Sequence, residues 1–296
     1  MSQQTSPSTQ RRYGISRVVR EWGLHRSTLY ARRARRTQPA RGRPGRRPTL
    51  DDAALLVEIR AVIAESPFHG EGHRKIWARL RALKGVRTSM RRVLRVMREA
   101  GVLAPARQPK PVVERPHEGR IVTTHPNVMW GTDATATVTL LDGQVMIFAA
   151  IDHCTAECVG IHAAIHGTRF EALEPVRQGV REHFGGMVAA VATGLAMRHD
   201  HGSQYMSDDF QAELRFLGIT SSPAFVRQPE GNGCIERFFR TLKEQLLWVK
   251  HFETVEDLRR ALLAFKETYN REWLIARLGY RSPAQVRQAF ALSAAA

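Results

Sequence analysis

The chain has 296 residues, of which 43% are hydrophobic and 25% charged, a balance typical of a globular protein with two or three domains. No run approaches the roughly eighteen apolar residues of a membrane span, and the polar first ten residues lack the apolar segment of a signal peptide. We therefore expect a cytoplasmic protein. Its three cysteines, an odd and sparse set, argue against a disulfide framework.

The positive charge is concentrated in the first part of the chain. Residues 1–120 hold 28 Lys and Arg against 9 Asp and Glu, a net charge of +19. Residues 121–296 hold 17 against 19, a net charge of −2, which together give the +17 of the whole chain. Lys and Arg release counterions condensed on phosphates, and arginine suits bidentate contacts to phosphate and guanine. This distribution indicates a nucleic-acid partner.

Residues 13–36 are predicted to form a helix-turn-helix, after a disordered tail over residues 1–12. The first helix carries apolar residues at helical spacing, namely Ile15, Val18, Val19 and Trp22. Val19, Gly23 and Leu29 have the spacing that the motif requires, with the glycine at the turn. The second helix would present to a major groove the side chains of Arg26, Ser27, Thr28, Tyr30, Arg32 and Arg33. A plain helical hairpin without a DNA-binding role is the alternative.

Two linkers are predicted on either side of a second helical unit. Residues 37–49 are rich in Pro, Gly and Arg, so they cannot build a core but can follow a phosphate backbone or a minor groove. Residues 50–103 show three amphipathic helical patterns and indicate a compact, Arg-rich DNA-binding module. Prolines then mark a second linker over residues 104–120.

Strand and helix signals alternate through residues 121–287, before a short tail at 288–296. The predicted strands, of which the first two are joined by an Asp142-Gly143 turn, are 128–140, 144–152, 157–165, 195–199 and 219–224. The predicted helices are 168–184, 207–217, 233–249 and 254–271. This order is that of an RNase H-like fold. We therefore expect an α/β core with a mixed five-stranded sheet and flanking helices, preceded by small all-α modules.

Three acidic residues of this region are candidate metal ligands. Asp133 lies within an apolar strand, where a charge is costly without a partner. Asp200 ends a strand, and ligands bind at the carboxyl ends of strands in α/β sheets. Glu236 lies one turn into a helix and shares a face with Arg240 and Lys243, which could grip phosphate. Phosphodiester chemistry with two metal ions about 3.5–4 Å apart needs such converging carboxylates.

Other acids and potential ligands compete less well. Asp142 fits the turn before Gly143, and Asp208 and Asp209 fit the start of a helix. Glu230 lies in a Pro-Glu-Gly loop, where a solvated side chain is expected. A role near the site stays open for Asp152, at a strand end, and for His199 and His201, which flank Asp200. Zinc is not expected, because the potential ligands fall in different predicted domains: His69, His73, Cys154 and Cys158. Cys234 has no neighbouring base, so a catalytic thiol is not expected.

The spans WGTDAT, HDHGSQY and PEGNGCIERFFRTLKEQLLW resemble the three catalytic blocks of the integrase core in bacterial insertion-sequence transposases of the IS-three type, OrfB kind. Thirty-five residues separate Asp200 from Glu236, which is similar to the Asp–Asp–35–Glu spacing of that family. Residues 50–103 resemble the upstream helical module of the family, and the resemblance covers about residues 55–285. The chain departs from the family at His73, where many relatives have Tyr, and at Cys234-Ile235.

The resemblance implies a function. Asp133, Asp200 and Glu236 match the family's motif positions, so they would be the catalytic residues and the ligands of two Mg²⁺ or Mn²⁺ ions. The protein would be a nucleoid-associated bacterial transposase that joins the terminal repeats of a mobile element to target DNA, as at least a dimer. The alternatives are a DNA-binding regulator whose core has lost catalysis and another RNase H-like nuclease, such as a junction resolvase.

Overall fold

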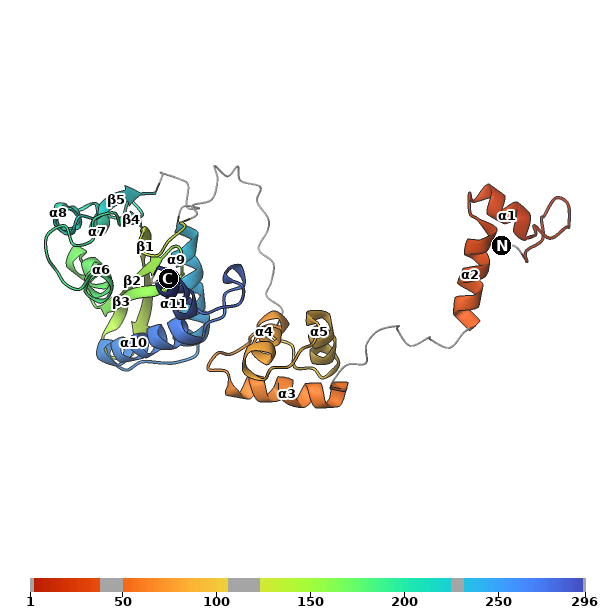
Figure 1. The fold of residues 1–296 in the computed structure, drawn as a ribbon, viewed down its shortest axis with the longest axis horizontal. Helices are drawn as coiled ribbons and strands as arrows, with labels where there is room; N and C mark the ends of the chain where they lie inside the picture. The colour runs from red at the N-terminus through yellow and green to blue at the C-terminus, as the bar shows by residue number, and fades with distance from the viewer. Residues whose placement is uncertain (1–2, 38–49, 106–122, 225–231, 295–296) are drawn as a thin grey trace. The chain divides into compact units, whose positions relative to one another are not determined.

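The computed structural model describes residues 3–37, 50–105, 123–224 and 232–294 (Figure 1). The chain divides into two compact units, residues 1–49 and 50–296. The linker expected at 37–49, apart from Thr37 at the end of a helix, and most of the linker expected at 104–120 lie outside the described residues. Within the part of the chain that the structure describes, no helix is long and apolar enough to cross a membrane.

The N-terminal unit contains two helices, α1 (Ile15–Glu21) and α2 (Arg26–Thr37). Gly23 adopts a left-handed φ of 60° between them, and Val19 is the buried residue of α1. Because the left-handed conformation favours glycine, the position of this turn follows from the sequence. Residues 3–12 differ from the expected disordered tail. They form a loop closed by an antiparallel bridge between Thr5 and Arg12. Backbone hydrogen bonds stabilise this loop, although the segment has few apolar side chains to bury.

The second unit begins with three helices, α3 (Asp52–Glu65), α4 (His73–Leu83) and α5 (Met90–Glu99). Asp51 caps α3 by accepting from Ala54 N, and Ser89 caps α5 by accepting from Arg92 N. Their shared core consists of Leu55, Ile59, Val62, Ile76, Leu80, Val93, Val96 and Met97. The periodicity of residues 50–103 is therefore that of a helical module with its own hydrophobic core.

The rest of this unit is built on one mixed sheet of five strands in the order β3-β2-β1-β4-β5. The strands are β1 (Met129–Thr139), β2 (Gly143–Asp152), β3 (Cys158–Ala164), β4 (Ala196–His199) and β5 (Thr220–Pro223). β1, β2 and β3 pair antiparallel, whereas β4 is parallel to both β1 and β5. This is the mixed five-stranded sheet that the order of elements predicts.

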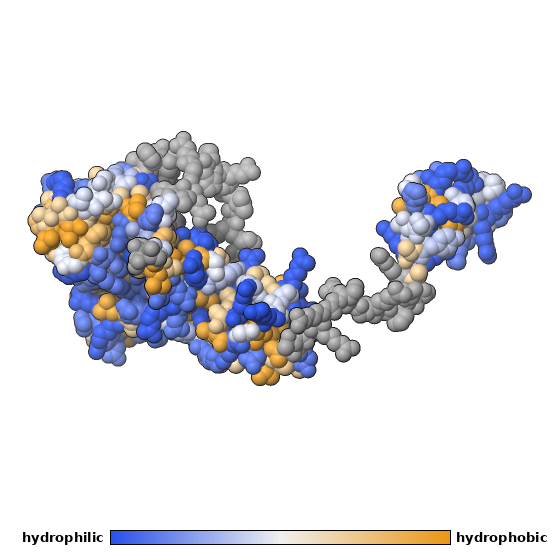
Figure 2. All heavy atoms as spheres, in the orientation of Figure 1, coloured by the Kyte–Doolittle hydropathy of each residue, from blue (hydrophilic) through white to orange (hydrophobic). Residues whose placement is uncertain are grey.

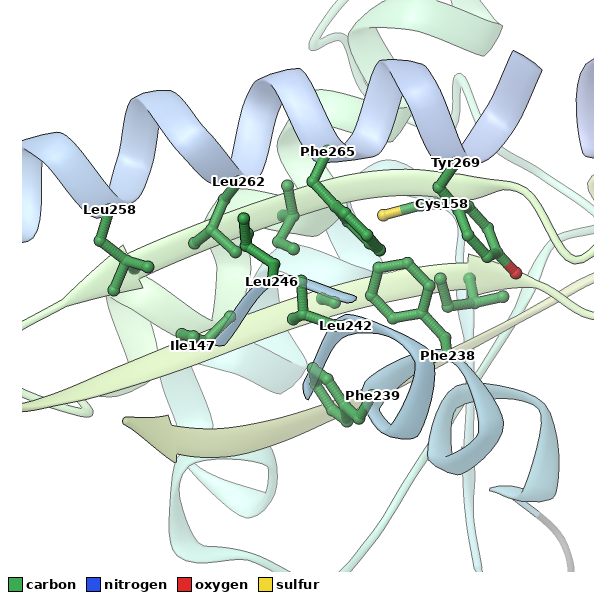
Figure 3. Close-up of a cluster of buried hydrophobic side chains, with 14 of the residues drawn as sticks. Ile147, Cys158, Phe238, Phe239, Leu242, Leu246, Leu258, Leu262, Phe265 and Tyr269 are labelled. Atoms are coloured by element: carbon green, nitrogen blue, oxygen red, sulfur yellow. The ribbon is translucent and has the colours of Figure 1, made fainter. Parts of the chain in front are cut away.

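Helices cover both faces of the sheet (Figure 1). On one face lie α6 (Arg169–Phe184), α7 (Ser203–Met206) and α8 (Asp208–Leu217). On the other lie α9 (Gly233–Leu242) and α10 (Val255–Glu272). Figure 3 shows the core of this second face, where Leu258, Leu262 and Phe265 of α10 point toward α9 and the strands. Alternation along β2 sends Ile147 and Ala149 to this face and Phe148 and Ala150 to the other.

Two elements depart from the helices expected near the end of the chain. The single helix expected over 233–249 is α9 followed by a π-helical turn, η2 (Lys243–Leu247). After a 3-10 turn, η3 (Ala276–Leu278), the helix α11 (Pro283–Ala294) runs through most of the expected tail at 288–296. Val286 of α11 is buried, so an apolar contact accounts for the order of this segment.

Candidate active site

The register of the sheet places Asp133 and Asp200 beside each other. In the parallel pair of β1 and β4, Gly131 is opposite Arg198. Asp133 and Asp200 each follow two residues later, Asp200 directly after the end of β4. Aligned residues of neighbouring parallel strands point to the same face and are about 5 Å apart. The two aspartates therefore lie side by side at the carboxyl end of β4.

Glu236 reaches this place from α9. Ile235, Phe238, Phe239 and Leu242 of that helix are buried against the sheet and α10, and Glu236 lies on its exposed flank. Asp133 is paired with Ala149 on β2, which belongs to the core under α9, so Asp133 points toward the face that α9 covers. Three elements, β1, the end of β4 and α9, thus bring the three expected carboxylates to one region.

The electrostatics of Asp133 reflect this crowding. The pKa of its carboxyl is raised to about 6, first by burial and then by the negative charges of Asp200 and Glu236. The backbone N–H of Ala134 donates to Asp133 Oδ1 over 2.8 Å and opposes the rise, as does the charge of Lys243. The metal-free site therefore holds negative charge that its own side chains do not fully compensate.

Lys243 and Arg240, expected on the face of Glu236, have different surroundings. Lys243 is half-buried, and its charge lowers the pKa of Asp133, so it acts on the carboxylate site. Arg240 is exposed, and its Nε donates to Glu244 Oε1 over 2.9 Å. A phosphate at Arg240 would therefore share that arginine with Glu244.

The six residues expected to contact DNA in the N-terminal unit are all exposed on α2: Arg26, Ser27, Thr28, Tyr30, Arg32 and Arg33. The visible surface of this unit is mostly hydrophilic in Figure 2. Exposed polar and basic side chains along one helix suit a nucleic-acid contact, and this contact stays a prediction.

The acids set aside in the sequence have structural partners. Asp142 Oδ2 accepts a hydrogen bond from Val255 N over 2.6 Å at the start of α10. Asp152, left open as a residue near the site, is fully buried and accepts from Asn127 N, Thr155 N and Thr155 Oγ1. Ser207, not Asp208 or Asp209, caps α8. Glu230 lies outside the described residues.

The two histidines beside Asp200 also differ from each other. His199 is fully buried, its Nε2 lies 2.9 Å from Ser221 Oγ, and its ring stacks on Tyr205. Burial lowers the pKa of His199, so it is a neutral packing residue. His201 is exposed.

Glu157, Glu182 and His183 form another group of potential metal ligands, apart from the three carboxylates. Lys266 Nζ lies 2.9 Å from Glu182 Oε2, and the guanidinium of Arg287 pairs with Glu157. Because cations already neutralise these carboxylates, the group forms a structural charge network. None of the three cysteines belongs to it, and all three are free thiols.

Sequence reasoning missed Tyr205 and Asn232. Tyr205 is fully buried. Burial raises the pKa of Tyr205, and the charges of Asp133 and Asp200 raise it further, so the hydroxyl lies near the carboxylates. Asn232 is buried at the start of α9. The only signal for either was its position inside a motif block.

Two protein families match separate parts of the chain, one in the sheet-containing core and one in the helical module. The family described as Integrase core domain matches residues 217–283, and the family described as HTH-like domain matches residues 49–110. The transposase InsD of insertion element IS2A/D/F/H/I/K from Escherichia coli is 28% identical over 278 residues, which cover 92% of this chain and 90% of that protein. An uncharacterized 48.2 kDa protein of insertion element IS2A, also from Escherichia coli, is 28% identical over 283 residues; they cover 94% of this chain but only 65% of that protein.

Two solved structures are also similar. The catalytic core domain of BIV integrase is 17% identical, with a TM-score of 0.43, over 57% of this chain and 99% of that chain. The catalytic core domain of HTLV-2 integrase in complex with magnesium, in its trimeric form, is 17% identical, with a TM-score of 0.42, over 55% of this chain and 98% of that chain.

The sheet order and the matched families define the class of this protein: it carries an integrase core domain of RNase H-like fold. It also carries an HTH-like domain, and transposases of insertion element IS2 are its homologues over most of its length. The resemblance expected from the three motif blocks is confirmed.

Proposed function

We propose that this chain is a transposase that cuts DNA at the ends of an insertion sequence and joins the ends to target DNA. The observation that carries the proposal is that Asp133 on β1, Asp200 directly after β4 and Glu236 on α9 come together, with the charges of Asp200 and Glu236 acting on the Asp133 carboxyl. The homology to IS2 transposases supports it.

The chemistry of the three side chains fits a hard divalent cation. Carboxylate oxygens are ligands that Mg²⁺ and Mn²⁺ prefer, and burial together with the charges of Asp200 and Glu236 raises the pKa of Asp133, a strain that a bound cation would relieve. Asp133, Asp200 and Glu236 would hold two such ions. When bound, they supply activation of an attacking oxygen and neutralisation of the charge on the leaving oxygen.

The reaction proceeds in two substitutions at phosphorus. A water oxygen attacks a phosphodiester at the element end, and the bond from phosphorus to the 3′ oxygen breaks, which frees a 3′-hydroxyl. This hydroxyl then attacks a phosphorus of target DNA, and a new ester bond forms as the target's own 3′ oxygen leaves. No bond to the protein forms. Lys243 would bind phosphate beside the carboxylates, and the exposed side chains of α2 would bind the terminal repeat.

The partners follow from this reaction. The substrates are the two ends of the element and a target duplex in the bacterial nucleoid. Because two ends react together, at least two copies of the chain would act on them. The basic residues of the HTH-like region and the N-terminal unit would supply most of the affinity for DNA.

The test is cleavage and joining of a labelled duplex that carries the terminal repeat flanking the gene, with Mg²⁺ or Mn²⁺. We expect the wild type to cut and join, and Asp200→Asn to lose at least about a thousandfold in rate while still binding the duplex. Asp208→Asn is the matched control, because Asp208 is an exposed acid at the start of α8. Binding without reaction by the wild type would favour a DNA-binding regulator. A preference for branched DNA would favour a different nuclease.

A further inference from the structure

A hydrogen bond from Asn232 joins the elements that carry Asp133 and Glu236. Asn232 lies directly before α9 and is only 7% exposed. Its Nδ2 donates a hydrogen bond to the backbone oxygen of Thr132 over 3.0 Å. Thr132 precedes Asp133 on β1, and Asn232 lies one helical turn before Glu236. This hydrogen bond therefore joins β1 and α9 within a few residues of Asp133 and Glu236.

The contact replaces a local hydrogen bond that asparagine ordinarily makes. At the N-cap of a helix, an asparagine side chain usually accepts from a backbone N–H of the first turn. Asn232 occupies the N-cap of α9, but its side chain makes no such bond. Its amide group faces β1 instead. The side chain thus stabilises the position of the helix relative to the strand, and it does not stabilise the helix end.

Gly131 provides the space for this contact. A Cβ at Gly131 would lie 2.5 Å from Asn232 Oδ1 and 2.7 Å from His153 Nε2, both closer than real Cβ atoms approach. Its backbone is not in the left-handed region, so it is the close approach of Asn232 and His153 that requires glycine. Among the described residues, neither Asn232 Oδ1 nor His153 Nε2 has a hydrogen-bond partner.

We propose that Asn232 is a positioning residue that fixes Glu236 relative to Asp133, with Gly131 as the small residue that admits it. The proposal rests on the proposed function, since it assumes that the carboxylates hold the metal ions. Partners that orient metal ligands typically change metal affinity by about 10- to 100-fold when removed. The buried stripe of α9 does not involve Asn232, so the helix keeps its packing without it.

The test measures Mn²⁺ binding by the full chain, from the electron paramagnetic resonance signal of free Mn²⁺, alongside thermal unfolding without metal. We expect Asn232→Ala to bind Mn²⁺ about tenfold more weakly and to unfold within a few degrees of the wild type. DNA cleavage by this variant should need a correspondingly higher Mn²⁺ concentration and approach the wild-type rate at saturation. Gly131→Ala should weaken Mn²⁺ binding in the same direction.

Asn270→Ala is the matched control. Asn270 is also 7% exposed, and it bridges α10 to β3 through hydrogen bonds with Cys158 N and Cys158 O, each 2.9 Å long. This variant should unfold at a lower temperature and keep the Mn²⁺ affinity of the wild type. If Asn232→Ala unfolds prematurely, Asn232→Ser, whose side chain is too short to reach Thr132, takes its place.

The outcomes separate the two proposals. Equal Mn²⁺ affinity of the wild type and a folded Asn232 variant would overturn the positioning role and leave the proposed function standing. An equal loss of affinity in Asn232→Ala and Asn270→Ala would also overturn it, because a general structural defect would then explain both. If the wild type binds no Mn²⁺, the proposed function fails, and the positioning role fails with it.

Discussion

At the scale of single residues, the carboxyl of Asp133 lowers the stability of the metal-free folded protein at neutral pH. Its carboxyl is mostly buried next to two other acids, and its pKa is about 6 against an ordinary value of 3.8. Between about pH 4 and pH 6 the folded state keeps a proton that the unfolded chain has released. The stability of the folded protein therefore falls as pH rises through this window.

Asp133→Asn should remove this pH dependence. We expect the metal-free variant to be more stable than the wild type at pH 7 by up to about 3 kcal/mol, and by much less at pH 4, because a shift of one pKa unit corresponds to about 1.4 kcal/mol. Urea unfolding of both proteins at the two pH values measures the difference. A difference between them that does not change with pH would contradict the raised pKa.

The sequence marks the three carboxylates as candidate ligands, whereas it does not mark the residues around them. Asp133, Asp200 and Glu236 lie in contiguous motif blocks with a familiar spacing, which is local information. Asn232 and Thr132 are 100 residues apart in the sequence, and a local sequence pattern cannot predict a hydrogen bond between such distant residues. Tyr205 likewise stood out only as part of a motif block, because its burial and its stacking on His199 follow from the fold.

At the scale of elements, the close approach of α6 to the sheet depends on glycine. A Cβ at Gly160 on β3 would lie 2.0 Å from the backbone oxygen of Pro175 in α6. A Cβ at Gly179 of α6 would lie 2.8 Å from the ring of Trp130 on β1. The same helix therefore packs tightly on two strands, one of which carries Asp133.

Gly160→Ala should destabilise the protein by about 3 kcal/mol or more, because the atom it meets belongs to the backbone and cannot rotate away. Gly186→Ala is the control: a Cβ there would meet nothing within 4 Å, and its φ is not in the left-handed region. Calorimetric unfolding of both variants measures the effect. A Gly160→Ala protein as stable as the control would show that α6 shifts freely on the sheet.

Element boundaries were predicted well where a local signal marks them and poorly where a tertiary contact decides. Thr168, Ser207 and Thr254 cap their helices with their own side chains, as polar residues at helix starts do. The change from α9 to the π-turn η2 has no such signal. There, the Gln245 side chain exchanges two hydrogen bonds with the backbone of His69, 2.8 and 3.0 Å long, a contact between distant parts of the sequence.

At the scale of the whole molecule, charge and architecture are divided between the two units. Residues 1–49 contain 13 arginines, no lysine and a single acidic residue. Residues 50–296 contain the hydrophobic cores of the helical module and of the sheet. The excess of basic residues predicted from composition extends to residue 120, beyond the boundary between the two units, because the helical module is also rich in arginine.

Removal of residues 1–49 should leave the unfolding temperature of the rest unchanged, since the two units are compact by themselves. The affinity for a terminal-repeat duplex should fall, and the slope of log K against log salt should become shallower by about 0.9 for each phosphate that the shortened chain no longer neutralises. Fluorescence anisotropy between 50 and 200 mM salt, about the range over which phosphate neutralisation dominates the affinity, measures both. An unchanged slope would mean that these arginines do not bind DNA.

A change of ligand at Glu236 shows whether the three carboxylates hold the catalytic metal. Glu236→Cys replaces a hard carboxylate by a softer thiolate, which Mg²⁺ accepts poorly and Mn²⁺ accepts better. Cleavage of the labelled terminal-repeat duplex should be lost with Mg²⁺ and return in part with Mn²⁺, whereas Glu236→Gln should stay inactive with either ion. If Glu236→Cys and Glu236→Gln cut as well as the wild type with Mg²⁺, Glu236 is not a ligand and the account is wrong.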